Sequence, residues 1–234
     1  MEKYGIIGAM ESEVKELGGN LQNKETVEYS GLTFLCGFLG GKNVVIVKSG
    51  IGKVNAALCA QALILKFNVT AIINTGIAGA LRSGLKIFDF VISSAAVYHD
   101  FDTTAFGYKV GQVPGMVEQF TADKALGELA LNAFEKTEFA KEHKAVIGLI
   151  ASGDQFISDS KQKKNIKANF DPSCVEMEGA AIAHTCYLNK IPFVIVRCMS
   201  DMADETVEAT YSFNEDICAA ASACLVRKML ELAE

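Results

Sequence analysis

Short apolar runs rich in β-branched residues alternate with longer stretches of helical periodicity along the whole chain. Each short run can form one strand, and each longer stretch between two runs can form one helix. This alternation is typical of strands that lie side by side in a sheet with helices packed on both of its faces. The sequence therefore predicts an α/β fold: a three-layer sandwich whose central sheet is mixed and mostly parallel.

The expected elements follow from periodicity and from turn residues. The expected strands lie at 5–8, 32–38, 43–47, 71–74, 88–97, 145–151, 174–177 and 192–196. The expected helices lie at 11–20, 54–67, 123–135, 159–168, 179–188 and 215–232. A glycine pair between the second and third strands predicts an antiparallel hairpin. The glycine-rich segment 99–120 is expected to be a functional loop or a subunit contact.

The length and composition favour a single domain over residues 1–234. A chain of 234 residues can bury one substantial core, and α/β domains of this size commonly remain undivided. It has only three prolines, and no Ser/Gly-rich linker or internal repeat divides it. No apolar run approaches the length of a membrane span, so no membrane association is expected.

Charge and cysteine content restrict the partners and the compartment. The net charge of −6, with the basic residues scattered, argues against nucleic-acid binding, and Lys161, Lys163 and Lys164 are expected on a solvated helix face. The seven cysteines form no C-x-x-C pair and the three histidines lie at no ligand spacing, so no metal site is expected. Buried-type thiols without a signal segment predict a cytoplasmic protein.

Ligands of open α/β sheets bind at the carboxyl ends of the strands, so polar residues that follow a strand are the candidates for chemistry. The first such segment, Gly8-Ala-Met-Glu-Ser-Glu13, passes from a strand into a helix. A carboxylate in the first helical turn is stabilised as the anion by free backbone N–H groups, which suits a general base. Acidic residues are also common at helix starts for purely structural reasons.

Two glycine-rich segments also follow strands, Ser49-Gly-Ile-Gly-Lys53 and Ile73-Asn-Thr-Gly-Ile-Ala-Gly-Ala80. Glycines let the backbone approach a ligand closely and direct N–H groups towards it. Neither segment has the Lys-Ser/Thr ending of a P-loop or the G-x-G-x-x-G spacing of a dinucleotide site. An ordinary turn accounts for both segments equally well.

The segment Val175-Glu-Met-Glu-Gly179 carries two carboxylates separated by one residue. On a strand, Glu176 and Glu178 would point to the same side. A carboxylate is costly to bury without a partner, so each should meet either a ligand or a cation. Binding of ribose hydroxyls and a structural ion pair remain equal alternatives for this pair.

The strand at 192–196 runs directly into Arg197, Ser200 and Asp201. Burial would raise the pKa of the Asp201 carboxyl and allow it to hold a proton for donation. The alternative is that Ser200 and Asp201 simply cap the helix that follows.

Taken together, these segments closely resemble the bacterial 5′-methylthioadenosine/S-adenosylhomocysteine nucleosidases, within the purine nucleoside phosphorylase superfamily. The resemblance spans essentially the whole chain. The segments that carry it are, in order, Gly5–Val14, Ser49–Val54, Ile73–Gly76, Tyr98–Asp100, Thr104–Tyr108, Ser152–Asp154, Val175–Gly179 and Arg197–Asp201.

The resemblance implies a hydrolase of methionine salvage and the methyl cycle that needs no metal or organic cofactor. Its small-molecule substrates would be 5′-methylthioadenosine and S-adenosylhomocysteine, cleaved to adenine and the 5-thio-substituted ribose. It implies that Asp201 protonates N7 of adenine and that Glu13 activates the water that attacks C1′. Glu178 would accept the ribose hydroxyls with Met177 packed against the sugar, and Arg197 would order the water and the carboxylates.

The remaining expected positions also come from the resemblance. Phe156 would stack on adenine, and the backbone of Ile157 would recognise the edge of the base. The other substrate-binding positions that it implies are Met10, Ile51 and Ser200. It further implies a homodimer, in which the neighbouring subunit completes the 5′ pocket with Thr103, Phe106 and Pro114.

Some positions depart from the family pattern or have no assigned role. Many members carry Ser at the position of Ile77, close to the attacking water. The segment 202–213 is about two residues longer than in the enterobacterial form of the family, so either Tyr211 or Phe213 could close over the ligand. His99, beside Asp100, is expected to be structural. Methylthioadenosine, adenosylhomocysteine, 5′-deoxyadenosine and 6-amino-deoxyfutalosine remain alternative substrates.

Two other functions fit the same fold. A nucleoside phosphorylase would need a basic pocket beside Gly76–Gly79, where Arg82 is the only cation nearby in sequence, and Glu13 would repel phosphate. A non-catalytic nucleoside-binding protein would not require all three carboxylates. Hydrolysis is therefore the favoured prediction.

Overall fold

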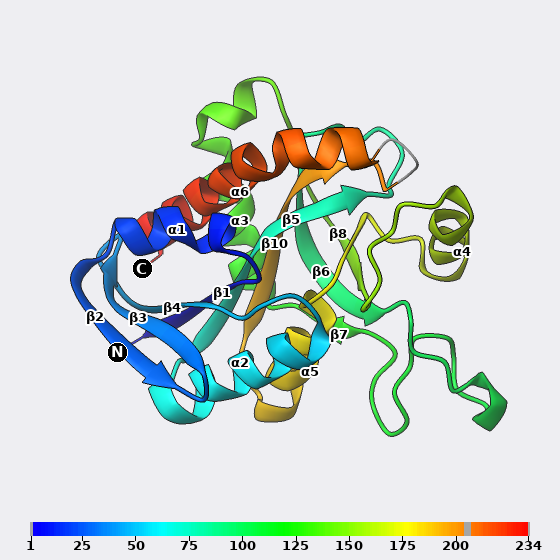
Figure 1. Ribbon diagram of the computed structural model, residues 1–234, viewed down its shortest axis with the longest axis horizontal. Coiled ribbons are helices and arrows are strands. Elements are labelled where there is room, and N and C mark those ends of the chain that lie inside the picture. Colours follow the sequence, from blue (N-terminus) through cyan, green and yellow to red (C-terminus); the bar gives the residue numbers. More distant parts are fainter. Residues whose placement is uncertain (1, 204–206, 234) are drawn as a thin grey trace.

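Helices cover both faces of a central sheet in the computed structural model of the protein (Figure 1). The structure describes residues 2–203 and 207–233, and of residues 207–213 it describes the backbone only. The strands are β1 (Lys3–Gly8), β2 (Gln22–Tyr29), β3 (Leu32–Leu39), β4 (Lys42–Lys48), β5 (Ala71–Ala80), β6 (Phe90–Tyr98), β7 (Phe120–Thr121), β8 (Ala145–Ser152), β9 (Cys174–Glu176) and β10 (Phe193–Asp201). The helices are α1 (Glu11–Gly19), α2 (Lys53–Phe67), α3 (Lys124–Glu135), α4 (Ser160–Phe170), α5 (Gly179–Asn189) and α6 (Val207–Leu232), with short 3₁₀ helices η1 (Thr104–Phe106) and η2 (Glu138–Lys141).

The sheet is mixed and partly closed on itself. Its strand order is β10-β6-β8-β9-β5-β1-β4-β3-β2, with β7 beside β6, and β10 also pairs with β5. The second pairing of β10 closes β5, β9, β8, β6 and β10 into a ring, where an open sheet was expected. The hairpin of β3 and β4 is confirmed, and the pairs β10–β6 and β5–β9 add antiparallel pairing that the sequence did not indicate.

Alternate side chains of the central strands enter two separate layers of the core, as the period of a strand dictates. Ile6 and Ile73 pack with α1, α3 and α6, whereas Ile7 and Ile72 pack with α2 and α5. Figure 1 shows α1 and α6 on one side of the sheet and α2 and α5 on the other. Both layers are needed because the central strands are buried on both faces, and this confirms the three-layer fold.

Two strands were not expected from the sequence. Strand β2 is formed by Gln22-Asn-Lys-Glu-Thr-Val-Glu-Tyr29, and all its residues except Val27 are exposed. It lies at the outer edge of the sheet beside β3, so no apolar face marks it in the sequence. Strand β7 has only two residues. Both misses arise because the apolar alternation that identifies strands is weak or absent there.

Two central strands are longer than the sequence indicated, and their extra residues include several of the predicted site residues. Strand β5 continues through the glycine-rich segment to Ala80, where a turn was one expected alternative. Strand β10 continues through Arg197 to Asp201, and α6 begins at Val207, so Asp201 is not the residue at the start of a helix. These polar residues are therefore held by sheet hydrogen bonds and not by a loop.

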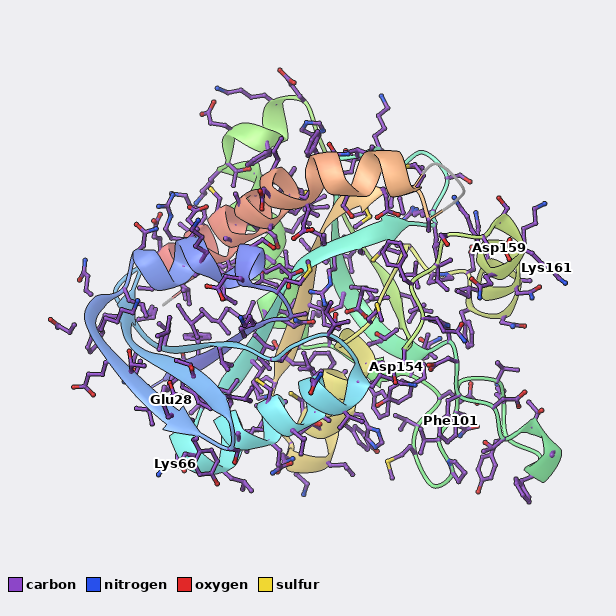
Figure 2. The ribbon with its side chains drawn as sticks, in the orientation of Figure 1. Glu28, Lys66, Phe101, Asp154, Asp159 and Lys161 are labelled. Carbon is purple, nitrogen blue, oxygen red and sulfur yellow. The ribbon has the colours of Figure 1, made fainter. Side chains whose placement is uncertain are left out.

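Other expectations concern helices and surface residues. Lys161 lies on α4, whose outer end projects from the body of the molecule near Asp159 and Lys161 (Figure 2). Among the described residues, no helix is both long and apolar enough to span a bilayer. All seven cysteines are free thiols.

Candidate active site

A pocket opens where the carboxyl ends of β1, β5, β9 and β10 meet. Its lining combines buried carboxylates with apolar side chains, as in sites for small organic ligands. The predicted site residues that line it are Met10, Glu13, Ile51, Phe156, Ile157, Met177, Glu178, Ser200 and Asp201. Segments that are distant in the sequence therefore meet at one cavity, which is where the sheet places a ligand.

Four of the predicted residues do not line the pocket of the single chain. Arg197 is buried beneath it, with only 2% of its surface exposed. Thr103, Phe106 and Pro114 belong to the segment between β6 and β7, which extends away from the body of the molecule (Figure 1). Phe106 is 80% exposed there.

Glu13 is held at the start of α1 by backbone N–H groups. Its Oε2 atom accepts hydrogen bonds from the N–H groups of Ala9 at 2.6 Å and Met10 at 3.0 Å. Its Oε1 atom accepts a third bond, at 3.1 Å, from the N–H of Ile77 in β5. The bonds to Ala9 and Met10 come from the turn that starts the helix, and the bond to Ile77 ties the carboxylate to the central sheet.

Burial decides the protonation of Glu13. Desolvation raises the pKa of its carboxyl, although Arg197 and the three N–H groups act in the opposite direction. The sequence predicted an anion stabilised by the helix start, and those bonds are present, but they do not outweigh burial. A carboxylate with a raised pKa is a stronger base once ionised, which suits proton abstraction from water.

Asp201 lies at the end of β10 with 3% of its surface exposed. Its Oδ1 atom accepts the N–H of Ala203 at 2.8 Å, and its Oδ2 atom accepts the hydroxyl of Ser200 at 2.8 Å. The pairing of β10 with β5 shifts between Met199 and Asp201, and this irregularity brings Asp201 opposite Gly79. A Cβ on Gly79 would lie 2.8 Å from Asp201 Oδ1, so this glycine leaves room for the carboxyl.

Glu176 and Glu178 both face the pocket, but not for the reason that the sequence suggested. Strand β9 ends at Glu176, and Glu178 is the residue at the start of α5, so strand alternation does not relate the two. Glu176 forms an ion pair with Arg197, while Glu178 Oε1 accepts the N–H of Gly52 at 2.9 Å. Glu176 therefore fits the expected structural ion pair, whereas Glu178 lies beside the cavity, where it could bind ribose hydroxyls.

The pKa of Glu178 is raised to about 8. Burial is the largest cause and repulsion by Glu176 the next, while Arg197 and the N–H of Gly52 oppose them. Two carboxylates close together in a desolvated place cannot both ionise at their ordinary pH. The local charge therefore depends on what occupies the pocket.

An ion-paired cluster joins the start of α2 to the segments that follow β6 and β8. Lys53 Nζ lies 2.7 Å from both carboxylate oxygens of Asp100, and the N–H of Lys53 donates to Asp154 at 2.8 Å. Asp154 lies near the start of α2 (Figure 2), and its own N–H donates to Asp100 at 2.8 Å. His99 packs against Gly153 behind this cluster, and burial lowers its pKa, so a neutral structural histidine fits its surroundings.

The pocket walls away from the carboxylates are apolar. Phe156 is half exposed at the rim, and Ile157 is buried behind it. Ile51, also exposed, approaches from the turn before α2, and Met10 and Met177 complete this lining. A flat apolar ligand group with a polar edge would fit between these side chains.

Sequence reasoning missed several residues that support the site. Asn74 Oδ1 accepts Arg197 Nη2 at 2.6 Å, and the Ser152 hydroxyl donates to Glu176. The sequence noted Ile77 only as a departure from the family pattern, whereas in the structure it lines the pocket and supplies the N–H for Glu13. Asn74 ends one apolar run and Ser152 follows another, which was the available signal, but only the fold shows their partners. The side chains of Tyr211 and Phe213 lie outside the described residues.

The surroundings of Gly76 bear on the phosphorylase alternative. Glu13 lies against Gly76, and the nearby Arg197 is buried and already paired with Glu176. Arg82 is exposed beyond the end of β5 and does not line the pocket. Among the described residues, no group of His, Cys, Asp and Glu side chains could hold a metal ion.

The chain is similar to known proteins in both sequence and fold. The sequence model of the phosphorylase superfamily matches residues 3–231. A 5′-methylthioadenosine/S-adenosylhomocysteine nucleosidase from Exiguobacterium is 47% identical over 214 residues, or 91% of this chain and 90% of the relative. A futalosine hydrolase from Helicobacter pylori has the same fold, with a TM-score of 0.92, 31% identity and full coverage of both chains (100% of each).

Two solved structures carry ligands. The nucleosidase from Colwellia psychrerythraea, in complex with adenine, has a TM-score of 0.94 and 43% identity, and the match covers 98% of this chain and 94% of that one. The nucleosidase from Neisseria meningitidis, in complex with methylthio-immucillin-A, has a TM-score of 0.96 and 39% identity over 100% of both chains. This chain belongs to the phosphorylase superfamily and, within it, to the 5′-methylthioadenosine/S-adenosylhomocysteine nucleosidases.

Proposed function

We propose that this protein hydrolyses the N-glycosidic bond of 5′-methylthioadenosine and S-adenosylhomocysteine and releases adenine. The observation that carries the proposal is that Glu13 and Asp201, two buried carboxyls from different elements, line one pocket together with Glu178. A solved relative in complex with adenine supports adenine as the nucleobase that is released.

Asp201 is the proposed acid. As the bond between C1′ and N9 breaks, its electron pair passes to the purine, and a proton from the Asp201 carboxyl goes to N7. Protonation makes the base a neutral leaving group, and a positioned acid typically contributes a factor of ~10²–10⁴. Asp201 is buried at the end of β10 and lines the pocket, so its carboxyl can meet the purine away from bulk water.

Glu13 is the proposed base. It would remove a proton from a water molecule whose oxygen forms the new bond to C1′, so the ribosyl product gains the hydroxyl. The ribosyl group becomes cationic as adenine leaves, and the carboxylates of Glu13 and Glu178 stabilise this charge electrostatically. Glu178 would accept hydrogen bonds from the 2′- and 3′-hydroxyls of ribose. None of these steps requires a metal or an organic cofactor.

The apolar walls would hold the base and the sugar. Phe156 would stack on adenine, the backbone of Ile157 would bind its edge, and Met177 would pack against ribose. Met10, Ile51 and Ser200 complete the proposed contacts.

Hydrolysis and phosphorolysis are distinguished by assaying adenine release in phosphate-free buffer. We expect full activity without phosphate, with free 5-methylthioribose as the second product. Strict dependence on phosphate, with a ribose-1-phosphate product, would contradict the proposal. A 7-deaza analogue of 5′-methylthioadenosine tests the acid step separately: it lacks the nitrogen that receives the proton, so it should bind without being cleaved.

We also propose that the protein acts as a homodimer. Helices α2 and α5 pack together and leave the large apolar side chains of Val54, Leu58, Leu65 and Leu188 exposed on one side of the molecule. Phe106, exposed in the extended segment, would then contribute with Thr103 and Pro114 to the 5′ pocket of the neighbouring subunit. The seven free thiols support a cytoplasmic location.

A further inference from the structure

Glu176 has more hydrogen-bond donors around it than any simple ion pair requires. Its carboxylate accepts the N–H of Glu178 at 3.1 Å and that of Gly179 at 2.8 Å. It also accepts the hydroxyl of Ser152 and the Nη2 group of Arg197. Ser152 is fixed in turn, because its oxygen accepts the N–H of Ala180 at 2.7 Å. The carboxylate is therefore locked in place between β8, β10 and the start of α5.

Arg197 connects this network to the surroundings of Glu13. Its Nη2 group donates to Glu176 and, at 2.6 Å, to Asn74, and its Nη1 group donates to the Val196 carbonyl at 3.2 Å. A Cβ on Gly76 would lie 3.3 Å from Arg197 Nη1, and Glu13 lies against the same glycine. The guanidinium is thus close to the proposed base.

Despite this closeness, Arg197 is paired with a single carboxylate. Among the described residues, its ion pair is with Glu176, and neither Glu13 nor Glu178 lies within ion-pair distance of a cation. Both nevertheless experience the charge of Arg197, which acts to lower the pKa of each. The arrangement gives electrostatic influence without direct contact.

We propose that Glu176 is a positioning residue that anchors Arg197 beneath the pocket, so that Arg197 pairs with neither Glu13 nor Glu178. This inference rests on the proposed hydrolytic function. An unpaired buried guanidinium is strongly unfavourable, so without the charge of Glu176 it would move to the nearest remaining carboxylate. Either Glu178 would lose its freedom to bind ribose or Glu13 would lose its freedom to take a proton from water.

The protonation of Glu178 offers a readout that a merely structural role would not change. The groups that face Glu178 are Glu176, Arg197, Glu13 and the N–H of Gly52. Removing the charge of Glu176 removes one repulsion and releases Arg197, and both changes favour the ionised form of Glu178. The pH at which Glu178 ionises should therefore fall.

The experiment compares E176Q with the wild type in adenine release from 5′-methylthioadenosine across pH 5 to 9. If Glu178 must be ionised to accept ribose hydroxyls, kcat/KM of the free enzyme rises with pH as this group loses its proton. We expect the rising limb to move to lower pH by about one unit or more in E176Q. We also expect kcat to fall at least about tenfold, because a misplaced reacting group can cost ~10²-fold.

A second variant separates charge from position. E176D keeps the charge on a shorter side chain, so kcat should fall while the rising limb stays in place. This variant also serves as the test if E176Q does not fold: an unchanged kcat in E176D would contradict positioning. The matched control is D123N, because Asp123 lies at the start of α3 and outside the pocket. This variant should lose thermal stability but keep both the wild-type kcat and the wild-type pH of the rising limb.

The outcomes are distinguishable. If the wild type releases no adenine from 5′-methylthioadenosine, the proposed function fails. If the wild type is active but E176Q keeps the wild-type limb and kcat, only the role of Glu176 fails.

Discussion

The carboxylate of Glu13 lies directly against Gly76, in the space where any other residue would carry its Cβ atom. A Cβ on Gly76 would lie 2.9 Å from Glu13 Cδ and closer still to Oε1. The neighbouring Ile77 supplies one of the hydrogen bonds that hold Glu13, so β5 both makes room for the proposed base and fixes it.

The substitution G76A should therefore displace Glu13. We expect kcat to fall by about 10²-fold, since a shift of about 1 Å in a reacting group can have this effect. The overlap should also lower the free energy of unfolding by about 1–3 kcal/mol. Adenine release and urea denaturation measure the two effects.

The control for this prediction is G127A. Gly127 lies inside α3, where an added Cβ meets no atom within 4 Å. Alanine is favoured over glycine in a helix by about 0.5–1 kcal/mol, so G127A should be more stable and equally active. Similar activity of G76A and G127A would show that Glu13 does not depend on Gly76.

The substitution D201N tests the acid. Asparagine keeps the size of the side chain but cannot donate a carboxyl proton, so kcat should fall by ~10²–10⁴-fold. Affinity for 5′-methylthioadenosine should stay within about tenfold, because the loss concerns mainly the transition state. Single-turnover kinetics and calorimetric binding measure the two quantities. D89N changes a buried aspartate outside the pocket and should retain turnover; unchanged turnover in D201N would rule out Asp201 as the acid.

The stability of the ligand-free protein should decrease as the pH rises from 5 to 8. The pKa of Glu178 is about 8 in the fold and near 4.5 in the unfolded chain, so the folded state binds the extra proton between these values. The resulting stability is complete below pH 4.5 and is lost as the pH rises through 8, at up to ~1.4 kcal/mol per pH unit. E178Q removes this group, so its thermal denaturation midpoint should depend less on pH over the same range. An equally steep pH dependence in E178Q would show that another group causes the effect.

The apolar surface of α2 should hold two subunits together. L58E places a charge among Val54, Leu58 and Leu65, so we expect a monomer in sedimentation-velocity experiments. Because Phe106 would then leave the neighbouring pocket, kcat/KM for S-adenosylhomocysteine should fall more than kcat/KM for adenosine. I217E changes another exposed apolar residue, on α6 across the sheet, and should leave the dimer intact. A wild-type protein that sediments as a monomer would contradict the proposal directly.

Five of the six helices could be predicted closely, because the starts expected at 11, 54, 123, 159 and 179 lie within one residue of the starts of α1 to α5. Helix α6 begins at Val207, although the sequence predicted a start at 215. Strand β2 was missed because Gln22–Tyr29 has almost no buried side chain. The extension of β5 was missed because glycines are read as turns, although here they allow close packing against Glu13 and Asp201.

The site was predicted in part for a similar reason. Local patterns drew attention to Glu13, Glu178 and Asp201 at the ends of apolar strands but left a structural alternative open for each, and their roles were implied only by the resemblance to the nucleosidases. The pairing of Glu176 with Arg197 joins positions 21 residues apart, and that of Asn74 with Arg197 joins positions 123 apart. Nothing local distinguishes such partners, because the ring of β5, β9, β8, β6 and β10 is what brings them together.

Gly76 and Gly79 give β5 a further property. The first accommodates Glu13 and the second accommodates Asp201, so both proposed catalytic groups are seated along one strand. Three residues of extended chain span about 10 Å. The spacing of the two glycines along β5 thus sets the spacing between the proposed proton donor and the proposed proton acceptor. Inserting one residue between the glycines would change the spacing between them by about 3.3 Å.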